Sequence, residues 1–110
     1  MTITHSQTQA CFDAWIKCEN LLTNLAKERD QFSKEIIKVM DECALICMGT
    51  FHAIKSYSPN IRNFALLCVG ICEECAEICE TEMDERLKEC AAVCRRCSKY
   101  ISTLAFSSLP

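Results

Sequence analysis

The chain has 110 residues and a net charge of -3; half of its residues are apolar and only 7% are aromatic. This length accommodates a single domain, residues 1–110, with one hydrophobic core. The charge offers no basic surface for nucleic acid or anionic lipid, and no apolar run approaches the roughly 20 residues of a membrane span, so we expect neither partner.

Four helices are predicted, because apolar residues recur every three or four positions and only two glycines and two prolines interrupt the chain. Ser6–Gln9 has the pattern of a capping box and predicts the start of the first helix. A polar cluster at Arg29 and Asp30 predicts the following turn, with Asp30 as the N-cap of the second helix.

The third and fourth helices are predicted after a proline and after an acidic turn. Ser58 suits an N-cap and Pro59 the first helical position, so we expect a helix from about Pro59 to Glu80. Residues 81–85 supply a cap and the acidic side chains that a helix N-terminus favours, and the last helix ends in a Ser-rich tail. Short connections between these helices predict an all-α fold, an antiparallel up-down-up-down four-helix bundle with a cysteine-lined core.

Eleven cysteines lie on the predicted inward faces of these helices. From Cys68 they are spaced 4, 3 and 4 residues apart, and from Cys90 to Cys97 they are spaced 4 and 3 apart, which is the rhythm of a buried helical seam. Free cysteine packs as a small hydrophobe, while its thiolate is a soft metal ligand. We therefore predict that all eleven are metal ligands: Cys11, Cys18, Cys43, Cys47, Cys68, Cys72, Cys75, Cys79, Cys90, Cys94 and Cys97.

Disulfides are the other common use of so many cysteines in a short chain. The N-terminus shows no basic segment followed by an apolar run, so we expect the reducing cytoplasm. The count is odd, and cysteines three or four residues apart on a helix have Cβ atoms about 5–6 Å apart, whereas a disulfide needs roughly 3.5–4.5 Å. Free thiols are therefore predicted.

Antiparallel packing of the four helices predicts a height for each thiol along the bundle axis. Cys11 is expected near one end. Next come a middle layer of Cys18, Cys43, Cys72 and Cys94, then Cys47, Cys68 and Cys97 just below it, and Cys75, Cys90 and Cys79 progressively toward the opposite end.

Such a column suits a soft monovalent ion, and Cu(I) accepts the low coordination that two thiols one turn apart can offer. Exchanging each S–H proton for one Cu(I) leaves the interior neutral, whereas a divalent ion on four thiolates leaves a charge of -2 in the core. We therefore predict multiple Cu(I) ions per chain, about one per thiol, and a folded metal-free form.

Two alternatives stay open. Cys72-x2-Cys75 and Cys94-x2-Cys97 are separated by 18 residues, a spacing that fits zinc, so the first alternative is a zinc or general soft-metal sink. The second is a helical interaction module whose cysteines only pack. Because these C-x-x-C pairs fall within helices and not at helix N-termini, no enzyme activity is expected.

Two residues outside the cysteine set could assist copper entry. Met40 precedes Cys43 by about one turn and offers a thioether, although a core residue is the simpler interpretation. His52 falls slightly off the inward face near the Cys11 end, where a surface residue is the simpler interpretation.

Three segments resemble the bacterial four-helix-bundle copper-storage proteins: DECALIC (Asp41–Cys47), SPNIRNFALLCVGICEECAEICE (Ser58–Glu80) and ECAAVCRRC (Glu89–Cys97). Cys11 and Cys18 continue the resemblance into the first helix. It implies Cu(I) bound by cysteines inside the bundle, no catalysis and commonly a homotetramer. A copper chaperone or a low-molecular-weight thiol is the expected exchange partner.

This chain departs from that family at several positions. A histidine that members often place between the third and fourth helices is absent from Thr81–Asp84. Relatives often have further cysteines where this chain has other side chains, so a lower capacity and a column interrupted at its ends are expected. These positions are Trp15, Leu22, Ala65, Leu87 and Ile101.

Overall fold

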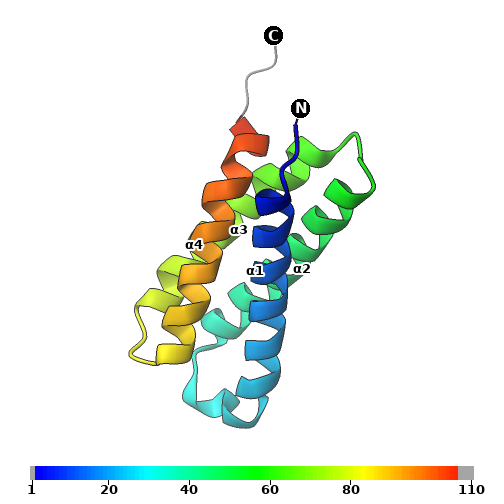
Figure 1. The fold of residues 1–110 in the computed structure, drawn as a ribbon. Helices are drawn as coiled ribbons and strands as arrows, with labels where there is room; N and C mark the ends of the chain where they lie inside the picture. The colour runs from blue at the N-terminus through cyan, green and yellow to red at the C-terminus, as the bar shows by residue number, and fades with distance from the viewer. Residues whose placement is uncertain (1, 107–110) are drawn as a thin grey trace.

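The computed structural model describes residues 2–106, the side chain of residue 29 apart, as four long helices and one short one. Successive long helices run in opposite directions (Figure 1), and no strand occurs among the described residues. The predicted all-α, up-down-up-down architecture is confirmed. The elements are α1 (His5–Leu25), the 3₁₀ helix η1 (Ala26–Gln31), α2 (Lys34–Lys55), α3 (Ile61–Glu80) and α4 (Glu85–Phe106).

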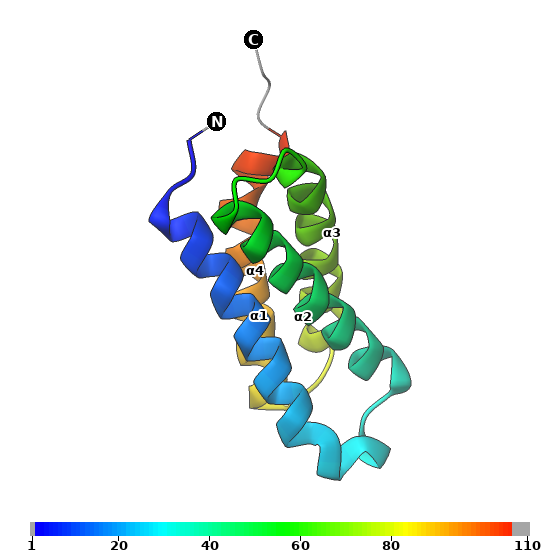
Figure 2. The same cartoon turned by 90° about the vertical axis from the view of Figure 1, so that its right-hand side faces the viewer.

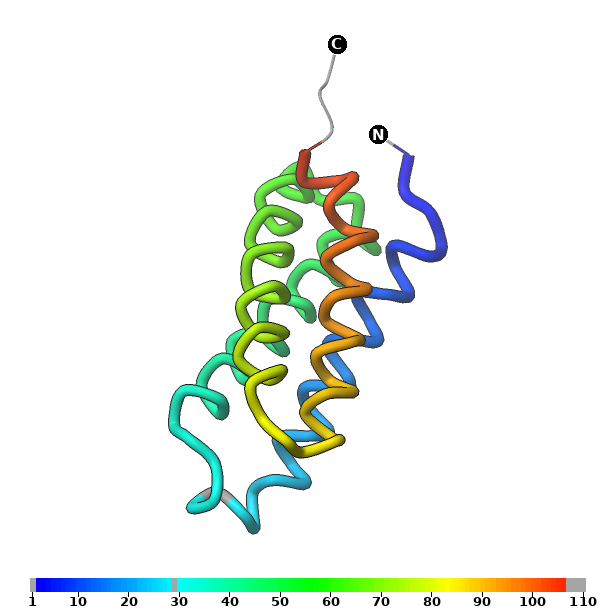
Figure 3. Tube along the Cα trace, turned by 90° about the vertical axis from the view of Figure 1, so that its left-hand side faces the viewer, coloured from blue at the N-terminus to red at the C-terminus, as the bar shows by residue number. Residues whose placement is uncertain are grey.

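The four long helices form a closed bundle in which α1 and α3 each pack against both α2 and α4. The views from the two sides show the helices enclosing one central axis (Figures 2 and 3). One end of the bundle, here named the terminal end, holds the start of α1, the end of α4 and the α2–α3 connection (Figure 1). The opposite end, the turn end, holds η1 and the α3–α4 turn.

α1 begins with a capping box. Thr4 Oγ1 accepts a hydrogen bond from the Gln7 backbone N–H at 3.2 Å, and Gln7 Oε1 accepts one from the Thr4 N–H at 2.8 Å. The prediction that Ser6 and Gln9 form this box was wrong. Gln9 instead donates to the Asp13 carboxylate at 2.8 Å, whereas the buried Gln7 side chain reaches back to the helix start.

The N-cap of α2 is Ser33 and not the predicted Asp30. After Leu25 the chain tightens into η1 with a backbone kink at Glu28 (φ -119°, ψ 18°), and Asp30 lies inside this 3₁₀ segment. Ser33 follows η1, and its Oγ accepts a hydrogen bond from the Ile36 N–H at 3.2 Å. The cap moved because η1 delays the start of the helix by one turn.

α3 begins two residues after the predicted Pro59. Its N-cap is Asn60, whose side chain makes no capping bond, and Ser58 Oγ accepts from the Asn60 N–H at 3.1 Å. The predicted acidic cap of α4 is confirmed, because Asp84 Oδ1 accepts from the Arg86 N–H at 2.8 Å. The predicted Ser-rich tail lies outside the described residues.

The core has sulfur in its middle and hydrocarbon at both ends. Buried aliphatic residues occupy the terminal end (Ile54, Ile61, Ala65, Ile101 and Leu104) and the turn end (Leu21, Leu25, Ile36, Met40 and Leu87). Within residues 2–106, no helix combines the length and apolarity that crossing a bilayer requires.

Candidate metal centre

All eleven cysteine side chains are fully buried, and none is joined in a disulfide. The prediction of inward, free thiols is therefore confirmed. The helical spacing explains the burial, since positions three and four residues apart share one face of a helix. Every sulfur consequently points into the bundle and none lies in a loop.

One group of sulfurs takes a single thiol from each long helix: Cys18 of α1, Cys43 of α2, Cys75 of α3 and Cys94 of α4. Their four Sγ atoms lie within 4.8 Å of one another. Cys94 Sγ is 3.8 Å from Cys43 Sγ and 3.9 Å from Cys18 Sγ. We name this set the four-helix group.

A second group of four, the three-helix group, consists of Cys47 from α2, Cys68 and Cys72 from α3, and Cys97 from α4, again within 4.8 Å. Cys47 Sγ lies 3.5 Å from Cys72 Sγ and 3.8 Å from Cys68 Sγ. Helix α1 contributes Cys11 beside this group, and the Cys11 S–H donates to the backbone carbonyl of Cys47 at 3.2 Å.

A third group, the turn-end group, joins Cys75 to Cys79 and Cys90, all within 4.8 Å. Cys90 Sγ is 3.7 Å from Cys18 Sγ, which links this group to the four-helix group. The two four-sulfur groups also touch, because Cys43 Sγ is 3.9 Å from the Cys47 sulfur and 3.9 Å from that of Cys72. The thiols thus form one continuous column along the bundle axis.

The predicted order of the column is wrong in two respects. The layer of Cys47, Cys68 and Cys97 lies on the Cys11 side of the middle layer and not between the middle layer and the opposite end, because Cys11 contacts Cys47. We expected Cys72 in the middle layer, but the structure places Cys75 there and groups Cys72 with Cys47 and Cys68. Cys72 and Cys75 are less than one helical turn apart, so a small axial offset of α3 is enough to exchange them.

Contacts between sulfurs separate the pKa values of the thiols. Hydrogen bonds with Cys18 and three other neighbours lower the pKa of Cys75 far below its usual value. Hydrogen bonds with Cys43 and its neighbours, together with burial, raise the pKa of Cys72. For Cys43 itself, the hydrogen bond with Cys18 lowers the pKa, but the bond with Cys75 and burial contribute to raising it to about 11 overall.

The charge of the surroundings decides which ion the column can accumulate. The buried polar residues among the described side chains are Gln7, Thr50 and Ser98, so no buried cation compensates for thiolates. A zinc ion with bonds of 2.3 Å to sulfur needs sulfurs about 3.8 Å apart, and the distances permit this. Divalent ions in both four-sulfur groups would, however, leave four negative charges in one apolar core, whereas one Cu(I) per thiolate leaves none.

Met40 and His52 lie outside this constellation. Met40 is fully buried among the aliphatic residues of the turn end, as expected of a core residue. The His52 ring stands on the surface against Trp15 and Phe51, with centroid distances of 5.7 and 5.6 Å. The structure therefore places His52 in an aromatic surface cluster and not in the sulfur column.

Three of the five positions at which the resemblance predicts cysteine in relatives lie beyond the ends of the column. Ala65, Leu87 and Ile101 are fully buried, with Leu87 at the turn end and the other two toward the terminal end. Trp15 and Leu22 are half-buried and pack against the core. Hydrocarbon thus closes the column where further sulfur would extend it.

Sequence reasoning missed one feature near the column, an ion pair between Arg86 and Glu28 at the turn end. The two residues are 58 positions apart, and neither belongs to a recognisable motif. The sequence gives no signal of which charged residues at helix ends will pair, so only the folded arrangement could reveal this pair.

Comparison with known proteins decides the family. Residues 2–105 match the family model described as copper storage protein, Csp. The chain belongs to the copper storage protein family. This match spans all four helices and all eleven cysteines.

Relatives in the copper storage family share the whole fold. Apo-Csp3 (copper storage protein 3) from Bacillus subtilis superposes with a TM-score of 0.84 at 25% identity, covering 94% of this chain and 100% of that chain. The Cu(I)-bound copper storage protein BsCsp3 superposes with a TM-score of 0.79 at 26% identity, covering 91% and 95%. An uncharacterized cysteine-rich protein of B. subtilis strain 168, YhjQ, is 29% identical over 98 residues, 88% of this chain and 91% of that protein.

Proposed function

We propose that all eleven thiols are Cu(I) ligands and that the chain stores about one copper ion per thiol at saturation. The observation that supports this most strongly is the continuous column of fully buried, unbridged sulfurs. Membership of the copper storage family and the Cu(I)-bound structure of a relative support copper as the cargo. Charge neutrality supports a one-to-one ratio, because each ion replaces one proton.

We propose that storage involves no catalysis and takes place in the reducing cytoplasm, with a copper chaperone or a low-molecular-weight thiol as exchange partner. Free thiols at high density support a reducing compartment. Thiolate ligands support release to competing thiols, which bind the Cu(I) themselves, or to acid, which protonates the cysteine sulfur.

Self-association, with a tetramer as in the resembling family, is also proposed. Its support is the set of large apolar side chains that the single chain leaves exposed to solvent and that contact with further copies would bury. These are Leu45, Leu66, Leu67, Met83 and Phe106.

Titration of the reduced protein with Cu(I) against a competing chelator tests the cargo. We expect binding to saturate near one copper per thiol, with the metal-free protein already helical by circular dichroism. Saturation by about two or three zinc ions in place of copper would support a zinc sink. Negligible binding of either metal would support cysteines that only pack.

Replacing Cys72 and Cys75 together by serine tests the ligand assignment, because these residues belong to the two different four-sulfur groups. We expect capacity to fall by about two copper ions with unchanged helix content. Ala76→Ser is the matched control, since it places a hydroxyl at a buried position of the same helix without removing a thiol. An unfolded double variant, or an unchanged capacity, would contradict the assignment.

A further inference from the structure

The sulfur column lies closer to the turn end than to the terminal end. Cys79 is the next-to-last residue of α3. At the terminal end, α4 continues from Cys97 to Phe106, about two and a half turns of helix. Metal passing through the turn end therefore crosses the thinner layer of protein.

A small aliphatic layer and an overhanging hairpin close this turn end. The α1–η1–α2 hairpin extends beyond the α3–α4 turn (Figures 1 and 3). Leu25, Ile36 and Met40 from the hairpin and Leu87 from α4 lie on the turn-end side of the sulfurs, each at most 1% exposed. In contrast, no described side chain of η1 is buried, so core packing does not hold this segment in place.

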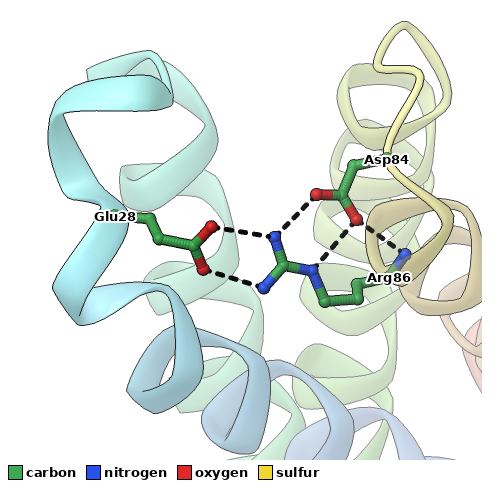
Figure 4. A network of polar contacts seen from close by, with 3 residues as sticks. All are labelled: Glu28, Asp84 and Arg86. Atoms are coloured by element: carbon green, nitrogen blue, oxygen red, sulfur yellow. Dashed lines mark hydrogen bonds and ion pairs between the residues drawn. The ribbon is translucent and has the colours of Figure 1, made fainter.

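The Arg86 guanidinium, at the start of α4, joins η1 to the α3–α4 turn. It lies between two carboxylates (Figure 4), with Nη1 donating to Glu28 Oε2 at 2.9 Å and Nη2 to Glu28 Oε1 at 3.4 Å. Its Nη2 also donates to Asp84 Oδ2 at 2.7 Å and its Nε to Asp84 Oδ1 at 3.1 Å. Glu28 follows Leu25 by three residues and Arg86 directly precedes Leu87, so the pair ties together the two sides of the aliphatic layer.

We propose that the Glu28–Arg86 pair is a latch that sets the rate at which Cu(I) enters and leaves the column at the turn end. While the pair is closed, Leu25 and Leu87 stay together beyond Cys79 and Cys90. When it opens, η1 moves outward and a thiol can reach the turn-end group. That thiol takes the Cu(I) as its thiolate, and the cysteine left behind regains the proton that the thiol released.

The partial exposure of this ion pair means that it can open without unfolding the bundle, which suits it to control the rate of copper exchange. The side chains of Arg86 and Glu28 are 42% and 34% exposed, and exposed ion pairs add little to global stability. Local opening of a segment depends on the few contacts that hold that segment, and η1 makes its extensive contacts with α1 alone. The latch therefore acts on exchange without being needed for the fold.

The test measures how fast excess glutathione removes copper from the fully loaded, full-length protein. This proposal rests on the proposed storage function, so capacity is measured first for every variant. Glu28→Gln is the main variant, because it leaves intact the ion pair of Arg86 with Asp84 and the cap that Asp84 provides for α4. Lys17→Gln is the control, since it breaks a different ion pair made by α4, Lys17 of α1 with Glu89 at 3.2 Å, whose side chains are 36% and 65% exposed.

We expect Glu28→Gln and Arg86→Gln to speed copper removal about threefold to tenfold, with unchanged capacity and helix content. Added salt should speed removal from the wild type, since it screens the pair, and have little effect on Glu28→Gln. Lys17→Gln should release copper at the wild-type rate.

Normal capacity with equal rates in Glu28→Gln and the wild type would overturn the latch alone. Equal acceleration in Lys17→Gln would overturn it as well, because any surface ion pair would then suffice. Failure of the wild type to bind copper would overturn the proposed function and the latch together.

Discussion

Gly49 and Gly70 show how two identical residues in helices can serve different purposes. A Cβ added at Gly49 would lie 3.1 Å from the Phe64 ring, whereas nothing lies within 4 Å of one added at Gly70. The sequence allowed close packing at Gly49 but could not show it, because the partner belongs to another helix. The structure shows that α3 approaches α2 through the edge of this ring.

At this scale we predict that Gly70→Ala raises the free energy of unfolding by up to about 1 kcal/mol, because alanine is the better helix former and meets no neighbour. Gly49→Ala should raise the free energy of unfolding clearly less, since the Phe64 ring must move to make room for the methyl group. Urea denaturation of the reduced, metal-free variants measures both changes. Equal gains would show that Phe64 yields without cost.

The helices themselves were predictable, and their ends were less so. Apolar spacing places all four helices correctly because burial of one face depends on the local sequence. Asp30 and Ser33 are both suitable caps, and the choice between them depends on how η1 leaves α1, which local sequence does not determine. The Glu28–Arg86 pair could not be predicted for the same reason, since it joins η1 to the first turn of α4, which only the bundle brings together.

At the scale of elements we predict that Ser33→Ala lowers the free energy of unfolding by about 1 kcal/mol, because the Ile36 N–H loses its capping oxygen. Asp30→Ala is the control and should change it little, since Asp30 lies in η1 with an exposed side chain. Thermal denaturation of the reduced proteins distinguishes the two positions. A larger loss of stability in Asp30→Ala than in Ser33→Ala would indicate that Asp30 is the N-cap of α2.

For the molecule as a whole, the burial of the thiols followed from their spacing, but their exact grouping did not. Each cysteine faces inward because its position on its own helix requires it. Which sulfurs meet depends on the axial offsets between helices. These offsets depend on how large buried side chains such as Leu87 and Met40 pack. This is why the layer predicted to contain Cys72 contains Cys75.

At this scale we predict that the metal-free protein loses stability between about pH 9 and 11. The pKa of Cys43 rises from 9.0 in the unfolded chain to about 11 in the fold. Above pH 9 the unfolded chain therefore releases a proton that the folded chain retains, so unfolding becomes more favourable by roughly 1.4 kcal/mol per pH unit for each such thiol. The stability that Cys43 contributes is fully present below pH 9 and is lost as the pH rises toward 11.

Urea denaturation of the reduced protein across this range measures the loss. The copper-loaded protein is the control, because its thiols have no protons left to release and its lysines and tyrosines titrate as before. A parallel decline in both forms would assign the pH dependence to those other groups.

The four-helix group brings one sulfur from each of the four long helices to a common point. Any cluster of ions bound there cross-links segments that are otherwise joined only by short connections. Bound copper ions would then link the four helices directly to one another, so proteases should digest the metal-free protein sooner than the copper-loaded protein.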